Sequence, residues 1–131
     1  MIAVDSSAIL ALAFDEPDAA QFAGPLAGAR CIVGWPTLLE VHLVLSGKGK
    51  TNALKIAEIW RSGDNVTTMP FDEAAYVVAA AAFDRFGKGR GHPAKLNFGD
   101  CLAYAVAKVH DVPLLYKGDD FALTDIRPAL P

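Results

Sequence analysis

Four carboxylates stand where a strand or loop gives way to a predicted helix. They are Asp5 in IAVDSSAIL, Glu40 in TLLEV, Asp100 in NFGDC and Asp119 in KGDDF. Because like charges repel, a fold that gathers these side chains needs a compensating cation. Oxygen ligands suit hard divalent ions such as Mg²⁺ or Mn²⁺. If the four acids meet, the sequence therefore predicts a metal site.

Three of these acids also have a purely structural interpretation. Asp5 could cap the helix that follows it, although Ser6 could do the same. Glu40 lies one turn into an apolar helix, where the helix dipole favours an acid. Asp100 follows Asn97 at the spacing of a capping box. The residue types alone leave both interpretations open for each acid.

The last acid has a neighbour of the same type. Asp119 and Asp120 follow a Lys-Gly pair, and a turn rich in Gly and Asp is common in proteins. The pattern does not decide which of the two points inward, and we favour Asp119. Four separate helix caps in this order would be a less economical account than one shared site.

A basic segment precedes Asp100. The stretch RFGKGRGHPAKLN carries Lys88, Arg90 and Lys95, and it holds no acid. Its glycines do not fit the phosphate-binding P-loop pattern. The segment is either a flexible solvated loop or an arm that grips the phosphates of a nucleic acid without reading its sequence.

Short apolar runs alternate with helical patterns along the chain, which is typical of an α/β domain with a mainly parallel central sheet flanked by helices. In such sheets the functional crevice lies beyond the carboxyl ends of the strands. The expected strands cover 1–4, 30–34, 65–70 and 112–116. The expected helices cover 7–14, 15–28 (interrupted at Pro25), 36–47, 50–63, 72–87 and 97–111, with a helical turn within 117–126.

Composition limits the class of protein. A chain of 131 residues predicts a single domain, 1–131. Hydrophobic residues make up 53% of the chain, so we expect a partner or a second copy to cover part of the surface. The apolar helices around 8–14 and 38–45 are the expected docking face.

The longest apolar stretch, AAYVVAAAAF, is too short to span a membrane. The N-terminus lacks the basic region of a signal peptide, so we expect a cytoplasmic protein.

The order of these motifs resembles the PIN-domain ribonucleases, specifically the VapC-like toxins of bacterial type II toxin–antitoxin modules. The resemblance rests on VDSSAILALAFDEPDA, TLLEV, FGKGRGHPAKLNFGDCLAYAVAK and VPLLYKGDDFALTDI, in collinear order over nearly the whole chain. It implies a PIN-like fold, Mg²⁺ or Mn²⁺ dependence, endonucleolytic cleavage of RNA, inhibition by a cognate VapB-like antitoxin, and a homodimer. It also implies the metal-ligand set Asp5, Glu40, Asp100 and Asp119. Family members vary between Asn and Asp in the closing motif, so Asp120 stays a rival for the fourth position.

The residues and the resemblance together give a mechanistic hypothesis. A bound metal would activate a water that attacks the scissile phosphorus, leaving a 5′-phosphate and a 3′-hydroxyl. Ser6 or Asn97, and Asp120 if it is not itself a ligand, would orient the carboxylates or the water. Lys88, Arg90 and Lys95 would bind the RNA backbone.

Three other functions compete with this hypothesis. A phosphohydrolase that uses Asp5 as a covalent nucleophile is disfavoured, because haloacid-dehalogenase-type enzymes carry a second acid where this chain has Ser7. A catalytically inert PIN-like module that binds RNA or protein is the main alternative. A stable α/β domain whose acids are all helix caps is the third.

Overall fold

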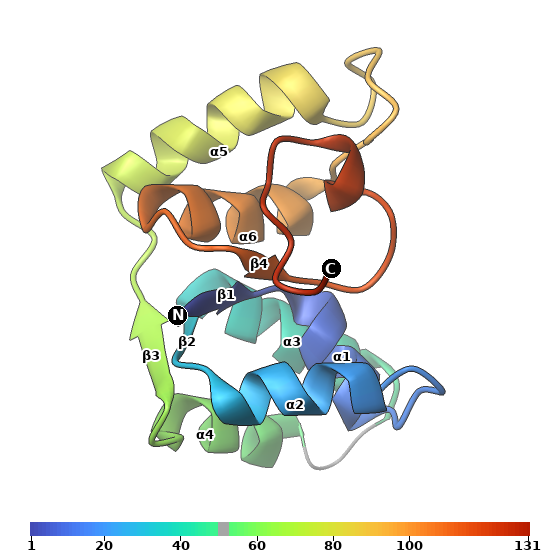
Figure 1. Ribbon diagram of the computed structural model, residues 1–131, viewed down its shortest axis with the longest axis vertical. Helices are drawn as coiled ribbons and strands as arrows, with labels where there is room; N and C mark the ends of the chain where they lie inside the picture. The colour runs from blue at the N-terminus through green and yellow to red at the C-terminus, as the bar shows by residue number, and fades with distance from the viewer. Residues whose placement is uncertain (50–52) are drawn as a thin grey trace.

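The computed structural model describes residues 1–49 and 53–131. In this part of the chain four strands form one parallel sheet in the order β3-β2-β1-β4 (Figure 1). The strands are β1 (Ile2–Val4), β2 (Cys31–Gly34), β3 (Val66–Met69) and β4 (Leu114–Leu115). β1 is therefore central, with β2 on one side and β4, which comes more than a hundred residues later, on the other.

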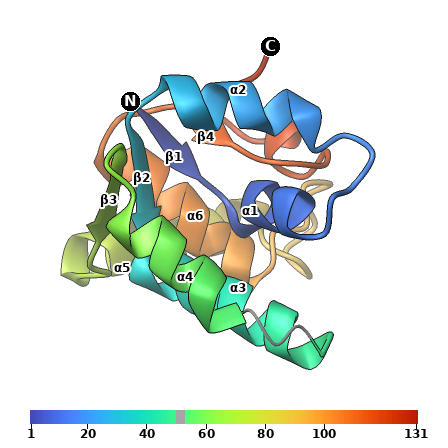
Figure 2. The same cartoon turned by 90° about the horizontal axis from the view of Figure 1, so that it is seen from below.

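Helices connect the strands and cover both faces of the sheet. They are α1 (Ser6–Ala13), α2 (Ala20–Gly28), α3 (Trp35–Gly47), α4 (Ala53–Ser62), α5 (Glu73–Phe86) and α6 (Phe98–Val109), and a 3₁₀ turn, η1, covers Phe121–Leu123. In Figure 1, α5 and α6 lie above the strands and α2 and α4 below them. Seen from below, α3 and α4 run side by side (Figure 2).

Alternation along the strands divides the core into two layers. Ile2 and Val4 of β1 face a cluster built with α1, α2 and α3, whereas Ala3 between them faces a cluster built with α5 and α6. The same alternation holds in β4, where Leu115 joins the first cluster and Leu114 the second. Strands covered on both faces read as continuous apolar runs, as in IAV and CIVG.

Helix caps set where the later helices begin. Asp72 accepts a hydrogen bond from the Ala75 N–H (3.0 Å) at the start of α5. Asn97 accepts one from the Asp100 N–H (2.9 Å), and the Asn97 N–H donates to the Asp100 carboxylate (3.0 Å), which completes a capping box at the start of α6. Both caps confirm the starts expected from the sequence.

The sequence-based helix over 15–28 is wrong at its beginning and at Pro25. The helix begins only at Ala20, because Asp15 adopts a left-handed backbone conformation (φ 49°) that turns the chain after α1. Pro25 lies inside α2 and does not interrupt it. The backbone carbonyl that its missing N–H would leave free belongs to Gln21, an exposed residue that water reaches. Residues 50–52, the expected start of the next helix, lie outside the described residues.

The sheet order creates a switch point at the carboxyl ends of the central strands. The chain leaves β1 and forms β2 on one side of it. After β3 it crosses back and forms β4 on the other side of β1. A crevice forms at such a point in parallel sheets. Asp5 follows β1 directly, and the KGDD segment follows β4. Within the described residues, no helix is both long and apolar enough to cross a bilayer.

Candidate functional site

Asp5 occupies the centre of the candidate site. Its side chain is 3% exposed, and its backbone N–H donates to the Leu115 carbonyl of β4 (2.9 Å). Oδ2 accepts hydrogen bonds from the N–H (3.1 Å) and the hydroxyl (2.5 Å) of Ser7, but Oδ1 is buried and has no hydrogen-bond partner among the described residues. Burial raises the pKa of Asp5 to about 7, the Ser7 hydrogen bonds oppose this rise, and the negative charges of Asp100 and Glu40 add to it.

The hydroxyl that contacts Asp5 belongs to Ser7, whereas the sequence-based interpretation gave this role to Ser6. Ser7 is the second residue of α1, and its N–H is one of those that a capping side chain reaches. Its hydroxyl therefore comes to lie over the same carboxylate oxygen. Ser7 Oγ also accepts a hydrogen bond from the Lys117 N–H (2.9 Å), so it links the ends of β1 and β4.

Glu40 reaches the site from α3, the helix that follows β2. Its Oε1 is buried and, like Oδ1 of Asp5, has no hydrogen-bond partner in residues 1–49 and 53–131. Its other oxygen lies against Gly99 of α6, where an added Cβ would overlap it. Glu40 is therefore directed toward the interior rather than along the exposed stripe of its helix. Gly99 is the residue that leaves room for it.

Asp100 lies in the first turn of α6. One carboxylate oxygen caps the helix through the Asn97 N–H, so the structural role considered from the sequence is real. Burial raises the pKa of Asp100, the Asn97 hydrogen bond opposes the rise, and the charges of Asp120 and Glu40 add to it. The cap and the acid cluster thus share this carboxylate, because a cap occupies only one of its two oxygens.

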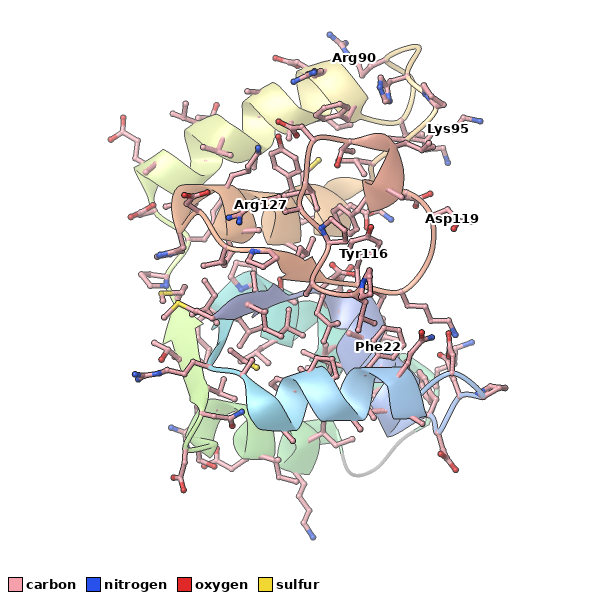
Figure 3. The ribbon with its side chains drawn as sticks, in the orientation of Figure 1. Phe22, Arg90, Lys95, Tyr116, Asp119 and Arg127 are labelled. Carbon is pink, nitrogen blue, oxygen red and sulfur yellow. The ribbon has the colours of Figure 1, made fainter. Side chains whose placement is uncertain are left out.

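The structure separates the two acids after β4. The charge of Asp120 acts on Asp100, whereas the charge of Asp119 acts on Tyr116, whose pKa is raised mainly by burial. Both acids are exposed, and Asp119 lies at the outer edge of the loop between β4 and η1 (Figure 3). Gly118 adopts a left-handed conformation (φ 102°) in this turn. Asp120 therefore fits the fourth position better than Asp119, the residue that we favoured from the sequence.

The acid cluster forms no ion pair with a basic side chain among the described residues. The charges of Asp100 and Glu40 add to the raised pKa of Asp5, and the charges of Asp120 and Glu40 add to that of Asp100, since a neighbouring carboxylate disfavours ionisation. Still, no three acid, histidine or cysteine side chains in the described part of the chain have the spacing of a complete ligand set. Two buried carboxylate oxygens without partners, beside a glycine that makes space for one of them, fit a hard divalent ion.

Backbone contacts between residues 86–88 and 96 close the base of the basic segment. A parallel bridge joins Gly87 to Leu96, with hydrogen bonds from the Lys88 N–H to the Leu96 carbonyl and from the Leu96 N–H to the Phe86 carbonyl (both 2.9 Å). The side chains of Lys88, Arg90 and Lys95 are exposed. Arg90 and Lys95 project outward from the loop between α5 and α6 (Figure 3). Arg90 lies 3.9 Å from Asp84, a distance at which two exposed charges interact only weakly.

Comparison with known proteins places the chain in a family. The PIN domain family model matches residues 2–126. Ribonuclease VapC28 of Mycobacterium tuberculosis is 42% identical over 129 residues, which cover 97% of this chain and 96% of the relative. The chain belongs to the VapC family of PIN-domain proteins.

Solved VapC structures share the fold. The crystal structure of Mycobacterium tuberculosis VapC20, titled a Sarcin-Ricin loop cleaving toxin, matches over 100% of both chains with a TM-score of 0.81 and 17% identity. VapBC2 from Rickettsia felis, bound to a DNA fragment from the promoter, matches 98% of this chain and 96% of that chain with a TM-score of 0.73 and 14% identity. The PIN-like α/β fold expected from the sequence is therefore confirmed.

Proposed function

We propose that this chain is a Mg²⁺- or Mn²⁺-dependent endoribonuclease and the toxin of a toxin–antitoxin module. The observation that carries the proposal is the pair of buried, unpartnered oxygens, Oδ1 of Asp5 and Oε1 of Glu40, beside Asp100 and Asp120. Leaving two such groups unpaired costs folding free energy unless a ligand compensates them. The VapC relatives are named as ribonucleases, which supports the reaction class.

The side chains have separate tasks in this proposal. Asp5, Glu40, Asp100 and Asp120 would hold the ion, and Ser7 and the Asn97 N–H would each fix one oxygen of a ligand so that the other is free. When bound, the ion would supply an activated water and neutralise charge on the phosphate. Because water and not the 2′-hydroxyl is then the nucleophile, the products would carry a 5′-phosphate and a 3′-hydroxyl.

The basic loop would bind the RNA backbone. Lys88, Arg90 and Lys95 are exposed on a loop whose last residues lead directly into α6 and Asp100. Contacts of this kind position RNA without reading its sequence, and they weaken as salt rises because bound counterions must be displaced. The proposal therefore expects cleavage at low substrate concentration to fall steeply with added salt.

The decisive experiment uses purified, antitoxin-free protein and a labelled pool of structured RNA. Cleavage is measured with Mg²⁺, with Mn²⁺ and with EDTA, and the ends of the products are identified. Asp5→Ala and Asp100→Ala test the site, and Asp64→Ala serves as the control because Asp64 is an exposed acid in the turn before β3. We expect metal-dependent cleavage with 5′-phosphate ends, lost in both site variants and retained in the control.

Three other results would contradict parts of the proposal. A 2′,3′-cyclic phosphate product would exclude the mechanism, and cleavage that survives both site substitutions would exclude the site. Folded protein that neither cuts RNA nor binds Mn²⁺ in calorimetry would favour the inert binding module.

A VapB-like antitoxin is the proposed partner. A solved VapC relative was crystallised as a VapBC complex, which supports this class of partner. A hollow of about 320 Å³ between α3 and α4 is lined by Trp35, Leu38, Leu39, His42, Ala57, Glu58 and Arg61. Trp35 and Leu39 are 45% and 57% exposed there, as a docking face for an apolar segment requires. In residues 8–14, the other segment expected to dock a partner, Ala8, Ile9 and Ala11 are buried and the remaining residues are partly exposed. A Leu39→Glu variant should lose the antitoxin in co-purification and keep its nuclease activity.

A homodimer is the second proposed assembly. A strongly apolar hollow of about 350 Å³ lies between α5 and α6, lined by Phe71, Tyr76, Ala79, Ala80, Phe83, Phe98, Cys101 and Leu102. Phe98 is 79% exposed and Tyr76 63%, more apolar surface than a monomer usually leaves open. Light scattering of the wild type and of Tyr76→Glu tests the proposal. A dimer that the substitution dissociates would support it, and a monomeric wild type would exclude it.

A further inference from the structure

Lys117 joins two segments that are a hundred residues apart in the sequence. Its ammonium group forms ion pairs with Glu16 and, at 3.0 Å, with Asp18, both in the segment between α1 and α2. All three side chains are only about a third exposed, at 35%, 30% and 33%. Partial burial makes such a pair stronger and less sensitive to salt than one on the open surface.

The backbone of the same residue leads to the acid cluster. The Lys117 N–H donates to Ser7 Oγ (2.9 Å), and Ser7 Oγ donates to Asp5 Oδ2 (2.5 Å). The Ser7 N–H binds the same oxygen (3.1 Å). Three hydrogen bonds thus connect the Lys117 backbone, through Ser7, with Oδ2 of Asp5. The other carboxylate oxygen, Oδ1, is left without a partner among the described residues.

We propose that Lys117 is a positioning residue for Asp5. Its side chain anchors the segment after β4, and the anchored backbone N–H orients the Ser7 hydroxyl, which holds Asp5 with Oδ2 engaged and Oδ1 free. The inference rests on the proposed function, in which Asp5 Oδ1 binds the metal. It concerns a residue outside the four-acid cluster and a different part of the chain from the basic loop.

Lys117 lies just beyond the residues of β4 that pair with β1. β4 has only two residues, and Gly118 directly after Lys117 takes a left-handed turn. A cavity of about 230 Å³ borders the segment, lined in part by Phe22, Tyr116 and Lys117. Figure 3 shows Tyr116 and Phe22 on the side of the β4 segment that faces α2. Lys117 therefore borders open space on this side.

A direct contact between Lys117 and RNA explains the geometry less well. Two carboxylates already neutralise the ammonium group, so the local charge is negative and repels phosphate. A lysine that binds phosphate should be free of such partners, as Lys88 and Lys95 are in having no ion pair among the described residues. The two roles predict different measurements.

The test compares Lys117→Met with a matched control, Lys108→Met. Lys108 forms an ion pair with Asp125 at 2.9 Å and is 37% exposed, so it matches Lys117 in burial and pairing but lies on α6 away from Ser7. Mn²⁺ binding to each folded protein is measured from the electron paramagnetic resonance signal of the unbound ion. Loss of a residue that orients a ligand typically weakens metal binding by about tenfold or more. We expect this for Lys117→Met, no change for Lys108→Met, and recovery in Lys117→Arg.

A double-mutant cycle with Ser7→Ala tests the route. If Lys117 acts through Ser7, Lys117→Met should have little further effect on Mn²⁺ affinity once the Ser7 hydroxyl is removed. Turnover should follow metal occupancy, with the KM for RNA unchanged. Independent effects of the two substitutions, or a change in KM alone, would overturn the proposal in favour of a direct contact with RNA.

The outcomes separate this inference from the proposed function. A wild-type protein that binds no Mn²⁺ contradicts the proposed function, whereas wild-type affinity in Lys117→Met contradicts only the role of Lys117. If Lys117→Met does not fold, Asp18→Asn and Glu16→Gln remove the anchor from its other end. The same loss of Mn²⁺ affinity in these variants supports the proposal, and full affinity in the double variant rejects it.

Discussion

Two groups of carboxylates in this chain differ in what neutralises them. Asp125 accepts a hydrogen bond from the Tyr104 hydroxyl (2.7 Å) and lies 2.9 Å from the Lys108 ammonium group. The pKa of Asp125 is lowered, because the contacts with Lys108 and Tyr104 outweigh the effect of burial. Asp5 and Asp100 are more buried, neighbour other acids, and have raised pKa values. Among the described residues, Lys108 thus pairs with Asp125, whereas no lysine or arginine forms an ion pair with Asp5, Glu40, Asp100 or Asp120.

The difference separates a carboxylate that is paired within the fold from carboxylates that have no counterion among the described residues. A buried charge without a counterion destabilises the native state, so a protein keeps several of them together only where something else supplies the opposite charge. The basic residues nearest in sequence to Asp100 lie on the exposed loop and leave the cluster itself uncompensated. The following substitutions test this contrast.

The largest effect should come from Asp5→Asn. Removing the central charge while keeping the shape should lower the rate of RNA cleavage by about 10³-fold, since the metal's contribution to catalysis amounts to several kcal/mol. Asp125→Asn, the matching change in the lysine-paired group, should leave the rate within about threefold of wild type because its role is structural. Single-turnover cleavage of one RNA checks both. Equal losses in the two variants would remove the distinction between the groups.

Gly99→Ala tests the acid cluster through Glu40, and it should slow RNA cleavage. The new methyl group would overlap the Glu40 carboxylate and move it. A displaced catalytic group can cost about 10²-fold in rate, and overpacking costs roughly 1–3 kcal/mol of stability. Gly24→Ala is the control, because a Cβ there meets nothing within 4 Å and replaces a glycine inside α2. It should raise stability by about 0.5–1 kcal/mol without affecting cleavage.

The two groups should respond to pH with opposite sign. The pKa of Asp5 is about 7 in the folded protein against 3.8 for an ordinary Asp, so in this window the folded state binds more protons. Metal-free protein should therefore lose stability as pH rises from about 4 to about 7, and Asp5→Asn should recover roughly 2 kcal/mol at pH 7. Thermal unfolding in EDTA across this range provides the measurement. A flat profile, or a variant less stable than wild type at pH 7, would contradict the assignment of an uncompensated charge.

Asp120→Asn and Asp119→Asn decide the fourth position. Because the charge of Asp120 acts on Asp100 and that of Asp119 does not, only the first substitution should weaken Mn²⁺ binding, by about three- to tenfold. Calorimetric titration of the two variants gives the answer. The reverse result would restore Asp119, the preference drawn from the sequence.

The smallest effect should come from the stability of Asp125→Asn. The Asp125 side chain is 40% exposed, so its ion pair with Lys108 is screened by solvent and contributes about 0.5 kcal/mol. Its lowered pKa means that this contribution is present above about pH 4 and is lost as pH falls further. Unfolding by urea at pH 7 and at pH 3 should show the difference from wild type at pH 7 only.

Much of the fold follows from local sequence signals. The strand of Ile2–Val4 and the capped starts of α5 and α6 were predictable, because apolar runs and short polar caps act over a few residues. The late start of α2 was not, since the left-handed turn at Asp15 depends on how the chain leaves α1. No aspect of the residue pattern distinguishes Pro25 inside a helix from Pro25 at its end.

The sequence was enough to single out the acids of the candidate site. It was less informative about the residues that hydrogen-bond to these acids or lie beside them. Asp5, Glu40 and Asp100 stand out because each interrupts or begins an apolar segment. The choice between Asp119 and Asp120, and between Ser6 and Ser7, depends on side-chain directions that one residue of register reverses. Lys117 gave no signal, because its partners lie a hundred residues away. A hint was present in the acids of DEPD, which we interpreted only as a helix start.

The sheet order β3-β2-β1-β4 also determines when the site exists during protein synthesis. β1 emerges first, but its second neighbour, β4, and the Lys117 N–H that holds Ser7 are made more than a hundred residues later. Contacts this distant in sequence form late. A nascent or truncated chain that stops before residue 114 carries Asp5, Glu40 and Asp100 yet lacks the strand that aligns them. The arrangement of these acids described above is therefore complete only after residues 114–120 have left the ribosome.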